Sequence, residues 1–183
     1  MSQDSGIARP PRTLVLGGAR SGKSAFAEQL AAASGVVRYL ATSVPDPDDH
    51  DFAERIARHR ERRPGDWSVV ESVDAAAVLA DPAPGAATLV DDIGTWLTAR
   101  IDALNAWDSP RGTVTPDVEA LVSAVADYRD RLIIVSPEVG MGVIPATRSG
   151  RLFRDEIGIL NQRLAAVCDE AFLVVAGLPV RLK

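Results

Sequence analysis

The sequence predicts an α/β fold of three layers, in which a mostly parallel sheet lies between helices. Short apolar runs rich in β-branched residues alternate with longer amphipathic segments along most of the chain, and this alternation is typical of a parallel sheet. The first such unit also contains a phosphate-binding loop, or P-loop, because it fits G-x-x-x-x-G-K-[ST] at every required position. We therefore predict a P-loop NTPase-type fold. The loop consists of Gly17, Gly18, Ala19, Arg20, Ser21, Gly22, Lys23 and Ser24.

The segments on either side of this loop agree with the motif. Residues 13–16 form an apolar run that predicts a buried strand, and residues 25–33 predict the helix that follows. Glycines let successive backbone N–H groups point at phosphate oxygens, and a helix N-terminus adds about half a positive charge. We expect Lys23 to neutralise the β- and γ-phosphates of a nucleoside triphosphate and Ser24 to bind Mg²⁺. A dinucleotide site fits less well, since no G-x-G-x-x-G pattern occurs.

Length and charge limit the possible partners. The chain has 183 residues and a net charge of −5, so neither nucleic acid nor an anionic membrane surface is the expected partner. Residues 1–12 are polar and predict a disordered lead-in without a signal sequence, whereas residues 13–183 predict a single nucleotide-binding domain. No apolar run reaches membrane-spanning length. The single cysteine, Cys168, fits a buried thiol in a reducing cytoplasm.

A second strand and a basic helix follow the first unit. Residues 36–41 predict a strand that ends at Thr42 and Ser43, and residues 44–49 predict a loop of prolines and acidic residues. Residues 52–63 predict the most basic helix of the chain. Its polar residues could simply be solvated. Alternatively, its arginines could bind phosphate oxygens and hold the His59 imidazole neutral, and a neutral imidazole can act as nucleophile or base.

Two further predicted strands end in acidic residues, and the second of them is expected near the phosphate loop. Residues 67–71 predict a third strand with Glu71 near its end, and residues 74–80 predict a short helix. Residues 87–92 form an apolar run that ends in acids, which is the Walker B pattern, in which a carboxylate meets the Mg²⁺ shell. We assign that role to Asp91.

The remaining chain continues the alternation. Helices are predicted over residues 94–106, 116–130 and 149–167, and strands over residues 131–136 and 171–176, with a short edge strand at 180–182. The loop at residues 137–145 follows a strand end. In an open parallel sheet such loops line the ligand crevice, so Glu138 is expected to face the site.

Taken together, these motifs resemble the bifunctional adenosylcobinamide kinase and adenosylcobinamide-phosphate guanylyltransferase of cobalamin biosynthesis. The resemblance covers residues 13–183. It rests on GGARSGKS, YLATS, RIARHRERRP, VDD, EVGMGVIP, FRDEIGILNQRLAAVCDEAFLVVAG and LPVRLK, in that order. The P-loop alone is unspecific, whereas EVGMGVIP followed by RLFRD and NQRLA is far more specific.

This resemblance implies two reactions in one cytoplasmic homotrimer. The family phosphorylates the aminopropanol hydroxyl of adenosylcobinamide with ATP or GTP, and then transfers GMP from GTP to adenosylcobinamide phosphate. The second step passes through a guanylyl-histidine, whose histidine falls on His59 here. The resemblance makes Lys23 the other catalytic residue and Ser24 and Asp91 the Mg²⁺ ligands. Besides the loop, it assigns nucleotide binding to Thr42, Ser43, Val44, Arg60, Glu61, Arg62, Arg63, Glu71 and Asp91.

The chain departs from the family pattern at a few positions, and other functions stay open. Arg58 stands where the family often has a second histidine, Pro137 where it commonly has asparagine, and Asp92 and Gly94 where cysteine and threonine are frequent. A P-loop kinase of another small metabolite is one alternative. A non-enzymatic GTP-binding switch is another, although no N-K-x-D base-specificity motif occurs. A member that has lost one of the two activities is a third.

Overall fold

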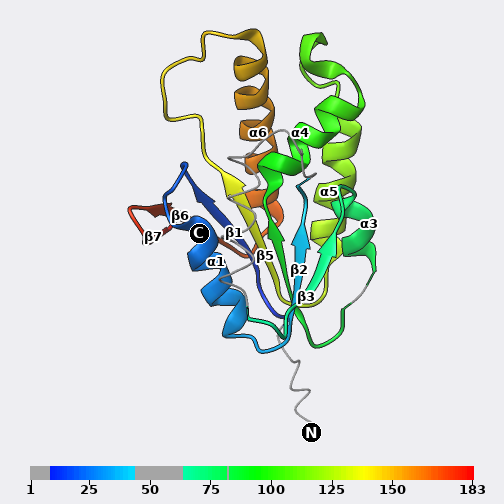
Figure 1. The fold of residues 1–183 in the computed structure, drawn as a ribbon, viewed down its shortest axis with the longest axis vertical. Helices are drawn as coiled ribbons and strands as arrows, with labels where there is room; N and C mark the ends of the chain where they lie inside the picture. The colour runs from blue at the N-terminus through cyan, green and yellow to red at the C-terminus, as the bar shows by residue number, and fades with distance from the viewer. Residues whose placement is uncertain (1–8, 44–63, 82) are drawn as a thin grey trace, which may run out of the picture.

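The computed structural model describes residues 9–43, 64–81 and 83–183, and these residues form one twisted sheet with helices on both faces (Figure 1). The strand order is β3-β2-β4-β5-β1-β6-β7. Neighbouring strands run parallel except β6 and β7, which are antiparallel. The strands are β1 (Arg12–Gly17), β2 (Val37–Ala41), β3 (Ser68–Glu71), β4 (Ala87–Asp91), β5 (Leu132–Pro137), β6 (Glu170–Val175) and β7 (Leu178–Arg181).

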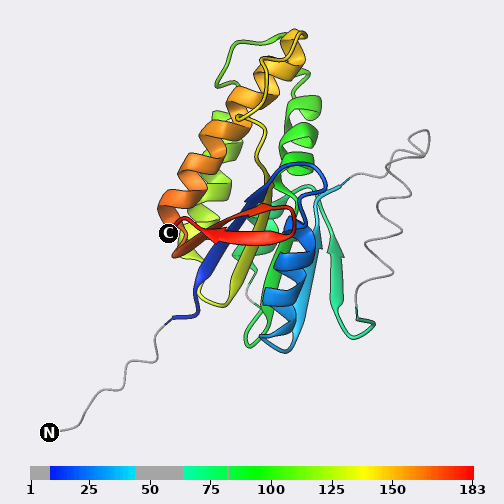
Figure 2. The same cartoon turned by 90° about the vertical axis from the view of Figure 1, so that its left-hand side faces the viewer.

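The helices divide between the two faces of the sheet (Figures 1 and 2). On one face, α1 (Lys23–Ala32) buries Ala27 and Ala31 against Val15 and Val135 of the central strands. The other face is covered by α3 (Ala75–Ala80), α4 (Ile93–Ala103), α5 (Thr115–Asp127) and α6 (Arg148–Val167), with the 3₁₀ turn η1 (Ala106–Asp108) between α4 and α5. The predicted α/β fold with a mostly parallel sheet is therefore confirmed.

Parallel pairing brings the strand ends to one edge of the sheet. Gly17 at the end of β1 pairs with Pro137 at the end of β5. Ala41 at the end of β2 pairs with Glu71 on one side and with Asp91 on the other. The phosphate loop and both predicted strand-end carboxylates therefore share the carboxyl edge of the sheet, where ligands bind in open α/β folds.

Two helices end earlier than the sequence predicts. The helix predicted over 94–106 ends at Ala103, because Asn105 takes a left-handed conformation with φ of 50° before η1. The helix predicted over 116–130 ends at Asp127, and Tyr128 is extended. The buried Tyr128 hydroxyl lies 2.7 Å from Thr88 Oγ1 and accepts a hydrogen bond from Arg38 at 3.2 Å. This contact with β2 and β4 favours an extended Tyr128 over another turn of helix.

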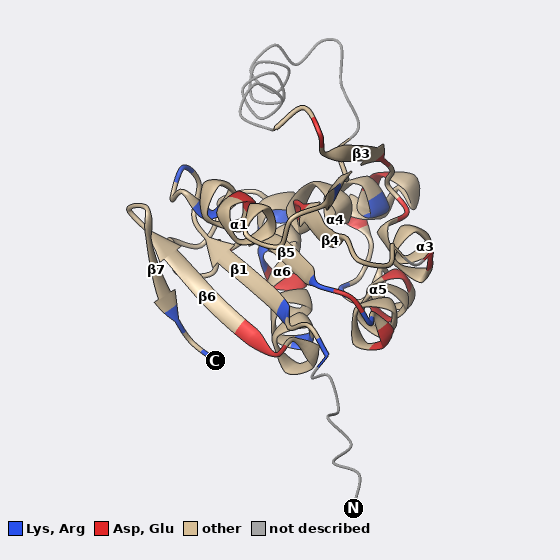
Figure 3. Ribbon diagram, turned by 90° about the horizontal axis from the view of Figure 1, so that it is seen from below, with Lys and Arg blue, Asp and Glu red and all other residues tan. Residues whose placement is uncertain are grey.

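At the opposite edge, basic and acidic residues meet where β1 and β6 begin (Figure 3). Arg12 belonged to the predicted lead-in, yet it is the first residue of β1 and donates from Nε to Asp169 at 3.1 Å. Arg9 donates to the same carboxylate at 3.2 Å. Residues 1–8 of the lead-in lie outside the described residues.

Cys168 is buried after α6, as predicted, and burial raises the pKa of its thiol to about 12. The thiol is therefore protonated at neutral pH and is a poor nucleophile. None of the described helices combines the length and the apolar character that a bilayer crossing requires.

Candidate active site

The phosphate loop turns sharply between β1 and α1. Gly22 caps α1 with a φ of 93°, and Arg20 has a φ of 56°. A positive φ suits glycine but strains the backbone of a residue with a side chain, such as Arg20. Strained backbone of this kind is typical of functional loops. The Ser21 N–H donates to Gly18 O at 3.3 Å, and the Gly177 N–H donates to Ser21 O at 2.8 Å. The loop is thus anchored by its own backbone and by the β6–β7 turn.

Gly17 has no room for a side chain. A Cβ atom at this position would lie 2.4 Å from Ser21 Oγ and 2.8 Å from the carbonyl oxygen of Val174. Because the second neighbour is backbone of β6, the contact could not be relieved by a change of rotamer. The glycine therefore allows the loop to start close against the sheet, as the motif predicts.

Lys23 and Ser24, the loop residues predicted to act on phosphate and Mg²⁺, begin α1. Lys23 Nζ donates to Gly18 O at 3.3 Å, so its ammonium folds back over the loop that would hold the phosphates. The Ser24 hydroxyl donates to Asp91 Oδ1 at 3.4 Å. The Tyr39 hydroxyl donates to Asp91 Oδ2 at 2.8 Å. The structure places Ser24 against Asp91. The sequence pattern predicts no role for Tyr39, since only the pairing of β2 with β4 brings Tyr39 to Asp91.

Ser24 and Asp91 suit Mg²⁺. One hydroxyl and one carboxylate oxygen face each other at 3.4 Å, and Mg²⁺ is usually held by one or two such groups together with water and phosphate oxygens. Within residues 9–43, 64–81 and 83–183, no cluster of three or more His, Cys, Asp or Glu residues could hold a metal on its own. The donor set fits an ion that binds together with a nucleotide.

Asp92 performs a different task from its neighbour Asp91. Its Oδ1 accepts a hydrogen bond from the Thr95 N–H at 2.8 Å and so caps α4. Burial raises the pKa of the Asp92 carboxyl, and the negative charge of Asp91 raises it further. The Thr95 hydrogen bond and the charge of Lys23 act in the opposite direction. The acidic pair is therefore electrostatically coupled to the phosphate loop.

The structure describes only some of the other residues that are predicted to contact the nucleotide. Thr42 is fully buried, and its hydroxyl donates to Asp92 O at 2.6 Å and contacts Thr95 Oγ1 at 2.8 Å, which links β2 to the start of α4. Ser43 is half-buried directly after it, and Glu71 is exposed at the end of β3. His59, the predicted nucleophile, lies outside the described residues, as do Val44, Arg60, Glu61, Arg62 and Arg63.

Glu138 lies beside the phosphate loop, as its position after β5 predicts. Its N–H donates to Gly17 O at 3.0 Å, and its carboxylate accepts from the Gly140 N–H at 2.6 Å. The strand end beneath it is held by Asn161 of α6. Asn161 donates to Pro137 O at 3.0 Å, and its amide oxygen lies 2.5 Å from Ser136 Oγ. Asn161 is a positioning residue for which the sequence pattern predicts no role.

Fold and site together define a P-loop nucleotide-binding protein of the α/β class, with a Walker-type carboxylate against the loop serine. A family model described as cobinamide kinase / cobinamide phosphate guanyltransferase matches residues 13–182. The chain belongs to this family, which confirms the resemblance drawn from its motifs.

Curated relatives agree with this assignment. The chain is 41% identical over 175 residues to the bifunctional adenosylcobalamin biosynthesis protein CobP of Pseudomonas aeruginosa, a match that covers 94% of this chain and 97% of the relative. It is 38% identical over 181 residues to the bifunctional adenosylcobalamin biosynthesis protein CobU of Salmonella typhimurium, covering 93% and 98% of the two chains. The Escherichia coli protein of that name is 37% identical over 180 residues, with the same coverage.

Similarity to solved structures extends to more distant proteins. A prototypical ATPase of a bacterial type III secretion system superposes with a TM-score of 0.58 at 10% identity, over 94% of this chain and 57% of that one. A protein of Pyrococcus horikoshii superposes with a TM-score of 0.51 at 10% identity, over 96% and 87%. At this identity the likeness concerns the fold alone.

Proposed function

We propose that this chain carries out both reactions of its family on one nucleotide site. It phosphorylates adenosylcobinamide with ATP or GTP, and it then guanylylates the resulting phosphate with GTP. The observation that carries the proposal is the contact between Ser24 of the phosphate loop and Asp91 of β4, in a chain that matches the family model over residues 13–182.

In the kinase step, the acceptor hydroxyl oxygen attacks the γ-phosphorus and the bond to the bridging oxygen breaks. The nucleoside diphosphate leaves, and the hydroxyl proton passes to solvent. The chain's own contribution is positioning and charge: backbone N–H groups of the loop and Lys23 hold the phosphates. Mg²⁺ held by Ser24 and Asp91 would supply further neutralisation of phosphate charge.

In the nucleotidyl step, a nitrogen of the His59 imidazole attacks the α-phosphorus of GTP and pyrophosphate leaves. The phosphate oxygen of the acceptor then attacks the same phosphorus, the P–N bond breaks, and the imidazole is restored. Covalent catalysis of this kind divides one difficult displacement into two. We assign nucleotide contacts around His59 to Val44, Arg60, Glu61, Arg62 and Arg63, and those on the sheet side to Thr42, Ser43 and Glu71.

We also propose that the protein is a cytoplasmic homotrimer. A cytoplasmic location suits an enzyme whose substrates are free ATP and GTP. An oligomer is supported by the loop between β5 and α6, whose Met141, Val143 and Ile144 are 73%, 95% and 66% exposed. Neighbouring apolar side chains as exposed as these are typical of interaction surfaces. Light scattering coupled to gel filtration would measure the mass of the assembly.

A two-stage product assay tests the function. The protein is incubated with adenosylcobinamide, Mg²⁺ and ATP, GTP is then added, and both products are followed by chromatography and mass spectrometry. We expect the phosphate first and the GDP conjugate second. Lys23→Met should lose both, whereas the matched variant Lys183→Met should keep both. A wild-type protein that binds GTP without forming either product would contradict the proposal and favour a switch or a different kinase.

A further inference from the structure

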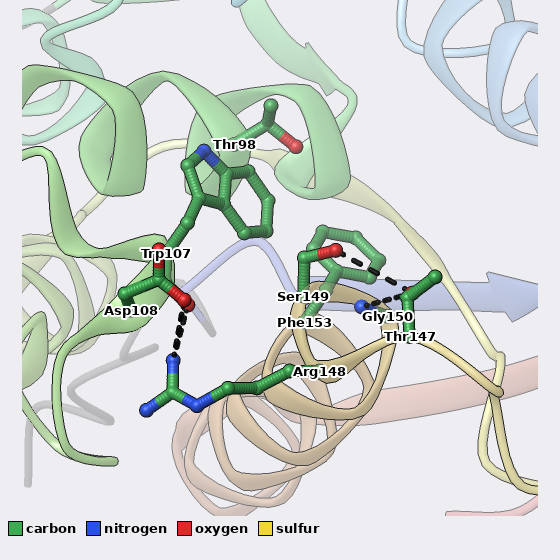
Figure 4. Close-up of a pocket in the computed structure, with 8 residues that line it drawn as sticks. All are labelled: Thr98, Trp107, Asp108, Thr147, Arg148, Ser149, Gly150 and Phe153. Carbon is green, nitrogen blue, oxygen red and sulfur yellow. Dashed lines mark hydrogen bonds and ion pairs between the residues drawn. The ribbon is translucent and has the colours of Figure 1, made fainter.

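A second concave surface lies beyond the phosphate site. A pocket of about 770 Å³ separates α4 and η1 from the first turn of α6 (Figure 4). Trp107 lines one wall and Phe153 the opposite wall, with Thr98, Arg148 and Ser149 around them. None of these residues belongs to the phosphate loop, to the strand-end carboxylates or to the residues assigned to nucleotide binding.

We propose that this pocket binds the corrinoid part of the acceptor and so presents the acceptor's hydroxyl or phosphate to the nucleotide. The inference rests on the proposed function, since it takes cobinamide as the acceptor. It adds the site at which that acceptor is recognised and the residues that recognise it.

The two walls of the pocket begin in segments that leave the carboxyl edge of the sheet, one after β4 and the other after β5. Helix α4 begins at Ile93, directly after Asp91 and Asp92, and Thr98 lies about 8 Å further along its axis. The opposite wall begins at Thr147, the end of the loop that starts with Glu138, which is hydrogen-bonded to Gly17. A ligand in the pocket therefore borders the carboxyl edge of the sheet, where the transferred phosphate must be.

Polar contacts hold the two walls in place without a ligand. Arg148 at the start of α6 donates to Trp107 O at 2.6 Å and to Ser109 O at 3.0 Å. A second link lies close by, where Glu156 of α6 is buried and accepts from the Gly112 N–H at 2.6 Å. Walls fixed in this way lose little conformational entropy when a ligand binds, which favours affinity.

The lining matches the chemistry of a corrinoid. Such a molecule has a broad, conjugated, apolar ring and a rim of amide side chains. The pocket offers aromatic surface from Trp107 and Phe153, with hydroxyl groups from Thr98 and Ser149 at its edge (Figure 4). The Trp107 indole N–H donates to Asp102 at 2.5 Å, which fixes the orientation of the ring. The volume lies within the range of about 300–1,000 Å³ found for small-molecule sites.

A second pocket, of about 540 Å³, provides a matched control. It lies between α3 and α5, where Ala76 and Ala120 are part of its lining, and it adjoins Tyr128 to Asp130 before β5 begins. It is therefore at the amino edge of the sheet, away from the phosphate loop. Ser123 lines this pocket as Ser149 lines the proposed one.

The test fills each pocket with one large side chain. Ser149→Trp and Ser123→Trp are compared with the wild type for the KM of cobinamide, the KM of ATP and the binding of cobinamide by equilibrium dialysis. We expect Ser149→Trp to raise the cobinamide KM and dissociation constant by about tenfold or more, equal to about 1.4 kcal/mol. The KM of ATP should stay within about twofold, as expected when nucleotide contacts are untouched. Ser123→Trp should change neither constant.

The outcomes separate the two proposals. If the wild type converts cobinamide and Ser149→Trp leaves both cobinamide constants unchanged, the pocket is not the acceptor site and the enzymatic function stands. If the wild type neither binds nor converts cobinamide, the proposed function fails and the acceptor site fails with it. Phe153→Ala provides an independent test. This substitution enlarges the pocket, so it should weaken cobinamide binding, as Ser149→Trp should.

Discussion

Gly94 and Pro137 are packed so closely that a side chain at position 94 would collide with the proline ring. A Cβ atom at Gly94 would lie 2.7 Å from Pro137 Cγ and 3.1 Å from Pro137 Cδ. Gly94 is in the first turn of α4, just after the Asp91 strand, and Pro137 ends the strand that leads to Glu138. These are two of the positions at which the chain departs from its family pattern. A glycine at position 94 is therefore compatible with the proline at position 137, whereas a larger residue would overlap with it.

A double-mutant cycle tests this contact. Gly94→Ala should destabilise the wild type by about 1–3 kcal/mol through overpacking. In a Pro137→Ala background the same change should be neutral or stabilising, because alanine is favoured over glycine in a helix by about 0.5–1 kcal/mol. Urea unfolding of the four proteins gives the coupling energy.

Gly158 supplies the control, since it lies in α6 and a Cβ there would meet nothing within 4 Å. Gly158→Ala should stabilise the protein in either background. Equal effects of Gly94→Ala with and without Pro137 would contradict the explanation.

The Tyr39 hydrogen bond to Asp91 should tune the affinity for Mg²⁺. Tyr39→Phe removes the donor from Oδ2 and leaves the carboxylate itself, so the apparent Mg²⁺ affinity should fall by about 10-fold. Asp91→Asn removes a proposed ligand and should lower both activities by more than about 100-fold. Mg²⁺ titrations of the kinase rate measure both effects. If Asp91→Asn were no worse than Tyr39→Phe, Asp91 would not be a metal ligand.

Asn161 should stabilise the end of β5. Asn161→Leu leaves the buried Ser136 hydroxyl and the Pro137 carbonyl without their partner on α6. The unsatisfied Ser136 hydroxyl is fully buried and should cost about 1–3 kcal/mol. The free energy of unfolding should therefore fall by at least about 1 kcal/mol. The neighbouring Gln162 is exposed on the same helix, and Gln162→Leu should change stability by less than about 0.5 kcal/mol. Similar losses in both variants would argue against a positioning role.

The ion pair at the start of β1 should contribute stability that depends on pH. The hydrogen bond from the Arg12 side chain lowers the pKa of Asp169 from 3.8 to about 2. Because the folded pKa is depressed, the contribution is fully present above about pH 4 and is lost as the pH falls through about 2. The Asp169 side chain is 39% exposed, so solvent screening limits the contribution to about 1 kcal/mol or less.

Unfolding of the wild type and of Asp169→Asn between pH 2 and 7 measures this contribution. The difference between the two proteins should be largest near neutral pH and should shrink toward pH 2. A difference that stays constant over this range would rule out the ion pair as its source.

The local sequence pattern was sufficient to predict those parts of the fold that depend only on residues close together in the chain. The phosphate loop, its flanking strand and helix, and the carboxylates that end β3 and β4 all follow from motif and periodicity. Glu138 was placed correctly because its position after a strand determines which edge of the sheet it occupies.

Contacts that depend on strand order could not be predicted in this way. Tyr39 meets Asp91 because β2 pairs with β4. The hydroxyl of Thr42 is directed to Asp92, although the family pattern assigns Thr42 to the nucleotide site. Asn161 holds β5 from a helix 24 residues further along the chain. Each of these is a tertiary contact between segments whose separate patterns carry no information about the partner.

The most direct test of the central claim is to label the protein with GTP that carries a radioactive α-phosphate. Wild type, His59→Ala and His50→Ala are incubated with this GTP and Mg²⁺, quenched in base and examined for label on the chain. We expect label on the wild type and on His50→Ala, which removes the other histidine of the chain. We expect none on His59→Ala, which should keep its cobinamide kinase activity. An unlabelled wild type, or a His59→Ala variant labelled as strongly as the wild type, would contradict a guanylyl-histidine at His59.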